Sequence, residues 1–231
     1  MSNEIRVFRT ERKYPLSDIE VSGLFSRLSA VMSGDPYNGT KAYMVRSLYF
    51  DTVYHDDYYE KMAGVERRRK IRLRIYDVNS PTAKLELKEK QGANQLKRSL
   101  TVSREEAEQI QRGDYSCLEK REEPLAKELF YFMTTKQYRP VCIVEYKRRA
   151  FMSLTNDIRI TFDSDIRSNE GNYNIFDKNL QTYPVYPMGN TILEVKYNGF
   201  LLSYIKDMIG TIYCHESATS KYCMARTFGL G

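Results

Sequence analysis

Charged and apolar residues alternate with a period of two in five segments of this chain, and most of the charged positions are basic. Successive side chains of a β-strand point to opposite faces, so this period predicts five strands. The segments are 70–76, 84–90, 144–148, 157–163 and 193–197. In the segment 70–76 the apolar face would hold Ile71, Leu73 and Ile75, and the basic face Lys70, Arg72 and Arg74.

Two arrangements satisfy this alternation. In the first, a sheet has one buried face and one solvated face, and ion pairs connect neighbouring strands across the solvated face. In the second, the strands form a barrel whose charged faces all point inward and line a tunnel for a polyanion. The alternation alone does not distinguish between them, although the choice decides the function.

The remaining pattern predicts a single α+β domain over residues 1–231. A capping box at Ser17 and Glu20 precedes an apolar stripe that reaches Met32, and a second box at Ser103 and Glu106 opens a helix over 104–112. Further helices are expected at 54–63, from Pro124 onward and over 200–213, and a long loop or irregular hairpin at 166–190. Strands are expected near 4–13, 43–51, 67–77, 83–90, 95–102, 140–151, 157–165 and 191–198.

Composition and motifs exclude several classes of function. The 36 Lys and Arg against 30 Asp and Glu give a net charge of +6, too weak for a protein that grips nucleic acid by charge alone. Four scattered cysteines and two histidines offer no zinc-ligand spacing. No Gly-rich phosphate loop, kinase motif set or nucleophile elbow occurs. With no signal pattern and no apolar run of about 18 residues, we expect a soluble cytoplasmic protein with reduced thiols.

What remains is a set of Lys and Arg residues on strands with a few carboxylates among them. Phosphoryl transfer depends mainly on positioning and on stabilisation of negative charge, so this inventory suits phosphoryl chemistry.

Eight short motifs, in order from residue 9 to about 224, carry a resemblance to a known family. They are Arg9–Tyr14, Ser47–Asp51, Lys70–Arg74, Glu86–Lys88, Glu145–Phe151, Arg159–Asp163, Leu193–Lys196 and Ser220–Tyr222. Together they resemble the polyphosphate polymerase domain of the vacuolar transporter chaperone (VTC) complex, within the triphosphate tunnel metalloenzymes. No single motif is specific, but the ordered set is.

The resemblance implies an eight-stranded antiparallel β-barrel tunnel with flanking helices. It also implies an ATP-dependent polyphosphate polymerase, a transferase that moves the γ-phosphate of ATP onto a growing polyphosphate chain. The implied cofactor is a divalent metal, manganese first and magnesium as the alternative. The expected partners are ATP and polyphosphate, with no nucleic acid and no direct membrane insertion. A separately encoded membrane protein would be needed for export of the polymer.

Site residues follow from the resemblance position by position. Glu194 falls on the metal-binding glutamate, while Glu11 and Glu86 would assist through water or ion pairing. Lys97, Lys196 and Tyr146 are expected to contact the substrate. The basic residues expected to bind phosphate are Lys13, Arg72, Arg74, Lys88, Arg148, Arg159 and Lys221.

One departure from the wider superfamily affects the choice of activity. The related hydrolases and cyclases begin with Glu-x-Glu-x-Lys, whereas this chain has Arg9 at the first position, followed by Glu11 and Lys13. Replacing a metal carboxylate with a cation favours the VTC branch, in a stand-alone, bacterial-type form. The alternatives are a triphosphatase of the same fold and a non-catalytic polyphosphate-binding module.

Overall fold

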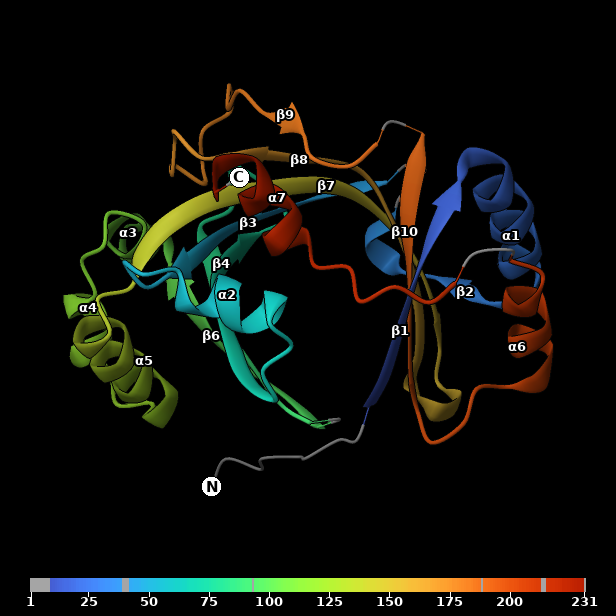
Figure 1. Cartoon of the computed structure of the whole chain (residues 1–231), viewed down its shortest axis with the longest axis horizontal. Helices are drawn as coiled ribbons and strands as arrows, with labels where there is room; N and C mark the ends of the chain where they lie inside the picture. The colour runs from blue at the N-terminus through green and yellow to red at the C-terminus, as the bar shows by residue number, and fades with distance from the viewer. Residues whose placement is uncertain (1–8, 39–41, 93, 188, 213–214, 231) are drawn as a thin grey trace. The chain divides into compact units, whose positions relative to one another are not determined.

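The computed structural model describes residues 9–38, 42–92, 94–187, 189–212 and 215–230, and it contains antiparallel sheet with flanking helices (Figure 1). The chain divides into two compact units, each assembled from three segments. The first unit takes residues 1–44, 146–166 and 186–219, and the second takes 45–145, 167–185 and 220–231. The long strands β7 (Arg139–Ser153) and β8 (Ile158–Asn169) contribute to both units.

In the first unit the strands pair in the order β1-β10-β8-β7, and β2 adds to β7. β1 (Arg9–Ser17) pairs antiparallel with β10 (Asn190–Asn198), which pairs antiparallel with β8. The short elements are β2 (Ser33–Gly34), η1 (Pro36–Asn38) and η2 (Thr155–Asp157). Two helices, α1 (Asp18–Val31) and α6 (Ser203–Gly210), lie beside this sheet (Figure 1).

The apolar face of β1, β10 and β8 forms the core of the first unit together with these helices. Leu193 and Phe162 are buried against Leu24 of α1 and Ile205 of α6. The predicted capping box at Ser17 is present and starts α1, because the Ser17 hydroxyl accepts from the N–H of Glu20 and the Glu20 carboxylate accepts from the N–H of Ser17. The alternation along β1 and β10 therefore leaves their polar positions on the face away from α1 and α6.

In the second unit the order is β7-β3-β4-β5-β6, and the short strand β9 (Tyr183–Pro184) pairs with β8. β3 spans Tyr43–Asp51, and a meander of β4 (Arg67–Ile75), β5 (Thr82–Gln91) and β6 (Asn94–Ser103) follows it. The helices are α2 (Asp56–Met62), α3 (Arg104–Ile110), α4 (Ser116–Glu119), α5 (Pro124–Thr135) and α7 (Lys221–Leu230).

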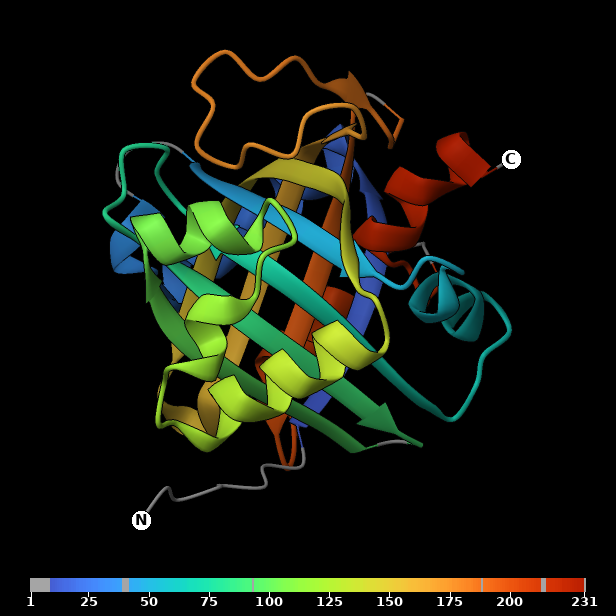
Figure 2. The same cartoon turned by 90° about the vertical axis from the view of Figure 1, so that its left-hand side faces the viewer.

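Helices α3 and α5 pack on one face of the β5–β6 hairpin, as Figure 2 shows. That face is the apolar one, since Ile71, Leu73 and Leu85 are fully buried. The buried residues on the helices are Ile110 of α3, Leu118 of α4, and Leu129 and Met133 of α5. The second capping box, at Ser103 and Glu106, is also present and opens α3.

The α+β class with antiparallel sheet and flanking helices is confirmed, as is the assignment of Ile71 and Leu73 to the buried face of β4. Closure into a barrel is not observed, because within the described residues of each unit the pairing order stays open at both ends. The prediction of a single domain over 1–231 stays a prediction. No helix in the described part of the chain has the length and apolar character needed to cross a bilayer.

Several boundaries differ from the sequence-based expectation. The first strand runs to Ser17 rather than residue 13, because its last residues still pair with Asn190–Ile192, while residues 4–8 lie outside the described part. The segment 166–190, predicted as a long loop or irregular hairpin, contains the end of β8 and the two-residue strand β9, which pair antiparallel as in a hairpin. The one-turn helix α4 and the terminal helix α7 were not predicted. The tertiary packing of such short or terminal helices contributes more to their stability than local propensity does.

Candidate functional site

The second unit carries a strongly basic sheet face on β4, β5 and β6, opposite the face covered by α3 and α5. Residues directly opposite each other in antiparallel strands project to the same side, so the pairing register defines rows across the face. The first row ends in Thr101, the second in Ser99 and the third in Lys97. The rows are Arg74–Lys84–Thr101, Arg72–Glu86–Ser99 and Lys70–Lys88–Lys97. In these three rows six basic residues thus share the face with one carboxylate.

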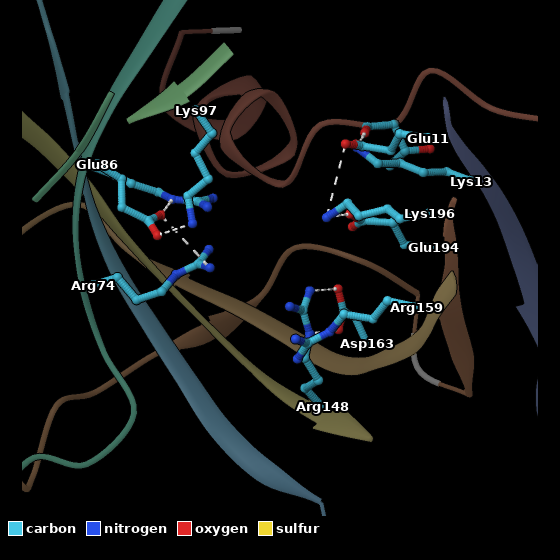
Figure 3. A network of polar contacts seen from close by, with 12 residues as sticks. Glu11, Lys13, Arg74, Glu86, Lys97, Arg148, Arg159, Asp163, Glu194 and Lys196 are labelled. Carbon is cyan, nitrogen blue, oxygen red and sulfur yellow. Dashed lines mark hydrogen bonds and ion pairs between the residues drawn. The ribbon is translucent and has the colours of Figure 1, made fainter. Parts of the chain in front are cut away.

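Glu86 is the centre of this basic face, as Figure 3 shows. Its Oε2 lies 2.6 Å from Nε of Arg72 and 3.9 Å from Nη1 of Arg74, and its Oε1 pairs with the Lys97 ammonium. The Glu86 residue is only 3% exposed. Burial disfavours the charged carboxylate, but Arg72, Arg74 and Lys97 together outweigh that effect and hold the pKa of Glu86 well below its ordinary value.

Strand β3 fixes the two arginines from their other side. Tyr49 lies opposite Arg72 in the register and its hydroxyl is 3.2 Å from Nη1 of that arginine. Ser47 lies opposite Arg74 and its Oγ accepts from Arg74 Nε at 3.1 Å. The motif Ser47–Asp51 therefore places two polar side chains that orient the guanidinium groups.

Lys221 begins α7, and its two neighbours fasten that helix end to the basic face. The Lys70 ammonium donates to Oγ of Ser220 at 2.6 Å. The Tyr222 hydroxyl donates to the buried carboxylate of Asp51, and its ring stacks on Tyr49 at 5.1 Å between centroids. Lys88, half-buried, lies between Lys70 and Lys97 in its row.

The first unit carries a second polar sheet face, on β1, β10 and β8, opposite α1 and α6. Two of its rows are Glu11–Lys196–Arg159 and Lys13–Glu194–Thr161. The Lys13 ammonium is 3.0 Å from Glu11 and donates to the carbonyl of Thr219 at 3.1 Å. The Lys196 ammonium pairs with Glu194 and is 4.0 Å from Glu11 (Figure 3). Cations and carboxylates alternate on this face.

Arg148, on β7, is held by a carboxylate that the sequence reasoning did not assign. Its Nε and Nη2 donate to the two oxygens of Asp163 at 2.6 and 2.7 Å, and Asp163 is fully buried. Burial disfavours the charge of Arg148, but Asp163 outweighs it and raises the pKa of the guanidinium well above its ordinary value. Its guanidinium also lies 5.3 Å from the ring of Tyr146. In this arrangement Arg148 therefore cannot form a bidentate contact with phosphate through Nε and Nη2.

Arg159, on β8, is held by a residue far away in the chain. Its Nη2 donates to Oδ2 of Asp35 at 2.7 Å and to the hydroxyl of Tyr43 at 3.3 Å. Burial raises the pKa of Tyr43, against the opposing effect of Arg148 and Arg159, so the hydroxyl stays protonated. Asp35 was part of a turn in the sequence and gave no signal of this role. Asp163 gave one, since it falls in phase with Arg159 on the alternating strand.

Each unit therefore gathers part of the predicted site. In the second unit Arg72, Arg74 and Lys97 converge on Glu86, with Lys88 in the adjacent row. In the first unit Lys13 and Lys196 lie beside Glu11 and Glu194. Tyr146 and Arg148 are both buried, while Lys147 between them is exposed and pairs with Asp165 at 2.9 Å, which is the phase that the family motif implied.

The donor chemistry of the first unit fits a hard divalent cation. Carboxylate oxygens are the ligands that magnesium and manganese prefer, and magnesium is commonly held by one or two carboxylates plus water and substrate phosphates. Glu11 and Glu194 share a face on neighbouring strands and supply two such groups. Among the described residues, no group of three or more His, Cys, Asp or Glu side chains is arranged to hold a metal ion.

Comparison with known proteins identifies the family of this chain. The sequence profile of the VTC domain family matches residues 8–228. No curated protein matches the chain. Similar solved structures include an adenylate cyclase candidate from Bacillus halodurans, at 16% identity and a TM-score of 0.55 over 95% of this chain and 96% of that one.

Two further structures share the fold. An adenylyl cyclase candidate from Hippeastrum, described as having a dominant triphosphatase activity, has 15% identity and a TM-score of 0.58 over 94% of this chain and 95% of that one. An adenylate cyclase candidate from Vibrio parahaemolyticus has 10% identity and a TM-score of 0.50 over 94% and 97%. At these identities the similarity shows the fold alone.

Proposed function

Because this chain belongs to the VTC domain family, we propose that it is a metal-dependent polyphosphate polymerase that uses ATP. The observation that carries the proposal is the basic face of β4, β5 and β6, where three adjacent rows hold six Lys and Arg residues and one carboxylate, Glu86. Like charges held together are costly unless a bound anion compensates them. A phosphate chain supplies closely spaced negative charges along such a face.

In this proposal the basic residues neutralise the phosphates, and no protein nucleophile is needed. The terminal phosphate oxygen of the polymer attacks the γ-phosphorus of ATP, the bond to the β–γ bridging oxygen breaks, and ADP leaves with that oxygen. Arg72 and Arg74 bind phosphate oxygens through their guanidinium N–H groups. Lys88, Lys97 and Lys221 supply charge from the same unit. Lys13, Lys196, Arg148 and Arg159, with Tyr146 beside Arg148, act from the first unit.

The metal belongs to the first unit. Glu194 would hold it, with Glu11 on the neighbouring strand, and when bound it would neutralise charge on phosphate oxygens. Manganese or magnesium satisfies this oxygen donor set. The eight-stranded barrel tunnel that the resemblance implies is part of the proposal, since it would enclose the phosphate chain away from water.

A triphosphatase of the same fold is the second candidate. The similar protein from Hippeastrum is described as having a dominant triphosphatase activity, which favours it. The two activities differ only in whether the acceptor oxygen belongs to the polymer or to water. The third possibility is a binding module without turnover. Such a module would bind polyphosphate even when no metal is present.

The test is incubation with ATP and manganese, followed by a gel stained for polyphosphate and by quantitation of ADP and free phosphate. We expect chains and ADP from the wild type, and a loss of about tenfold or more for Arg74→Ala, since a charge-assisted phosphate contact is removed. Arg67→Ala is the matched control. Arg67 lies on the same strand but on the opposite face, exposed and paired in register with Gln91, so its removal should leave the rate unchanged.

Free phosphate without polymer would establish the triphosphatase instead. Binding of polyphosphate with no turnover under manganese or magnesium would establish the binding module. Equal rates for Arg74→Ala and Arg67→Ala would show that the basic face takes no part.

A further inference from the structure

Thr161 has a buried hydroxyl that no other group in the described part of the chain binds. The residue lies on β8 and is 2% exposed, and its Oγ1 has no hydrogen-bond partner among the described residues. Leaving a buried hydroxyl unpaired costs about 1–3 kcal/mol. Nearly all buried polar groups are paired, so an unpaired one calls for a physical reason. A ligand that binds beside Thr161 would provide that reason.

The position of Thr161 indicates which ligand this is. In the strand register it lies directly opposite Glu194 on β10, and Glu194 in turn lies opposite Lys13 on β1. Directly opposite side chains have Cβ atoms about 4.5–5.5 Å apart on the same face. Glu11 projects to this face as well, two residues before Lys13. Three neighbouring strands thus present two carboxylates and one hydroxyl to the same side.

Two positive charges, the ammonium groups of Lys13 and Lys196, already lie at this place. The ammonium of Lys196 pairs with Glu194 and is 4.0 Å from Glu11, so it is shared by the two carboxylates. The ammonium has three N–H donors and no acceptor, so it can pair with the carboxylates. It makes no hydrogen bond to the hydroxyl of Thr161, although that oxygen could accept one. The Lys13 ammonium also lies 3.0 Å from Glu11, so both carboxylates already have a cationic partner. The hydroxyl of Thr161 is the oxygen donor in this set that neither ammonium satisfies.

We propose that Oγ1 of Thr161 is an oxygen ligand of the divalent cation held by Glu194, with Glu11 on the same face. The inference rests on the proposed function and deepens it, because it adds a ligand to its metal site. A hard cation takes several oxygen ligands, and a neutral hydroxyl adds one without adding charge. Thr161 keeps its proton on binding, and the ammonium of Lys196 moves away from the carboxylates while retaining its own.

The test measures binding of Mn²⁺ alone, by loss of the electron paramagnetic resonance signal of the free ion, at low ionic strength. Thr161→Val removes the oxygen and keeps the shape of the side chain. We expect it to weaken Mn²⁺ binding about five- to tenfold, the size of one neutral contact. Thr161→Ser keeps the hydroxyl and should bind Mn²⁺ within about twofold of the wild type. Glu194→Gln should weaken binding more than either.

The melting temperature without metal distinguishes a metal ligand from a structural residue. If the hydroxyl is unpaired in the metal-free protein, Thr161→Val unfolds at the same temperature as the wild type or higher, because Val buries no polar atom. A fall of several degrees would mean that Thr161 has a structural partner, and would overturn the proposal.

The remaining outcomes separate this inference from the proposed function. Mn²⁺ affinity lost in Glu194→Gln but unchanged in Thr161→Val overturns the role of Thr161 and leaves the metal site standing. Affinity unchanged in both, or no saturable binding by the wild type, overturns the metal site itself and the inference with it. Weaker binding of metal-free tripolyphosphate by Thr161→Val, with Mn²⁺ binding intact, assigns the hydroxyl to phosphate instead.

Discussion

The guanidinium of Arg148 donates through Nε and Nη2 to both oxygens of Asp163, at 2.6 and 2.7 Å, and the carboxylate is fully buried. A buried, bidentate pair of this kind depends on both partners, because removing one leaves the other charge buried without compensation. Arg148 is therefore oriented by Asp163 before any phosphate arrives.

We predict that Asp163→Asn destabilises the protein by about 3–5 kcal/mol, since Arg148 then carries a buried charge without a counter-ion. Urea unfolding monitored by circular dichroism measures this change. The double variant Arg148→Met with Asp163→Leu should recover most of the loss, because apolar residues of similar volume replace the pair. A double variant as unstable as Asp163→Asn would mean that the loss does not come from the uncompensated charge of Arg148.

Glu86 provides the second prediction, because it holds three cations together in the absence of an anion. Glu86→Gln should lower the free energy of unfolding by about 3 kcal/mol. Tripolyphosphate should then raise the melting temperature of this variant more than that of the wild type, since the added anion replaces the missing charge. Equal shifts in the two proteins would contradict the idea that Glu86 and the ligand compensate the same cations.

The matched control is Glu89→Gln. Glu89 lies on the same strand as Glu86 but projects to the opposite face, where it pairs with Arg98 at 2.7 Å. This variant should respond to tripolyphosphate as the wild type does. Because the pKa of Glu86 is depressed in the folded protein, its contribution is present above the unfolded value of about 4.3 and is lost as the pH falls below it. As the pH falls, the free energy of unfolding of Glu86→Gln should therefore decrease less than that of the wild type.

Asp57 leads to a prediction with the opposite pH dependence. It is 2% exposed, its carboxylate accepts from the Tyr138 hydroxyl at 3.0 Å, and burial together with the charge of Asp51 raises its pKa to about 8. Between the unfolded value of about 3.9 and the folded value, the folded protein keeps a proton that the unfolded chain has lost. Its contribution to stability is present below the unfolded value and is lost as the pH rises through about 8.

Asp57→Asn should therefore remove a decline in stability of at most about 1.4 kcal/mol per pH unit across this range. Urea unfolding at three pH values, about 5, 7 and 9, measures the slope for each protein. Asp56→Asn is the control, because Asp56 is adjacent in sequence but exposed. This substitution should leave the slope unchanged. The same slope in wild type and Asp57→Asn would contradict the prediction.

The Tyr222 hydroxyl connects α7 to Asp51, whose carboxylate also accepts the backbone N–H groups of Asp57 and Tyr58 at the start of α2. Tyr222→Phe should cost about 1.5–3 kcal/mol, the value of a hydrogen bond to a charged group. It should also weaken tripolyphosphate binding, because the helix end that carries Lys221 loses one of its attachments, while the Lys70–Ser220 hydrogen bond remains. Urea unfolding and isothermal titration calorimetry measure the two effects.

Two variants separate stability from binding in this region. Lys221→Met should weaken tripolyphosphate binding but change the free energy of unfolding less than Tyr222→Phe does, because a partly exposed ammonium contributes little to stability. Tyr131→Phe removes the hydroxyl of an exposed tyrosine on α5 and should change neither quantity. If Tyr222→Phe loses stability but binds tripolyphosphate as the wild type does, then α7 does not position a phosphate-binding residue.

Local patterns in the sequence were sufficient for the long strands, their faces and most helices, but not for α4 and α7. The period of two assigned Arg72 and Arg74 to one side of β4 and Ile71 and Leu73 to the other, because alternation is a property of a single strand. The capping boxes at Ser17 and Ser103 predicted the starts of α1 and α3, since their hydrogen bonds close within three residues. The ordered motifs predicted the family.

Only the tertiary structure decided which charges meet. Alternation places Glu86 on the basic face, but the strand register makes Arg72 its direct neighbour and puts Thr161 opposite Glu194. Asp35 reaches Arg159 across 124 residues of sequence, and no local pattern encodes that contact. A strand's sequence sets the face of each side chain, whereas strand pairing and loop closure set its partners. The sequence therefore determined the basic faces of this protein, and the fold determined which carboxylate or hydroxyl orients each cation.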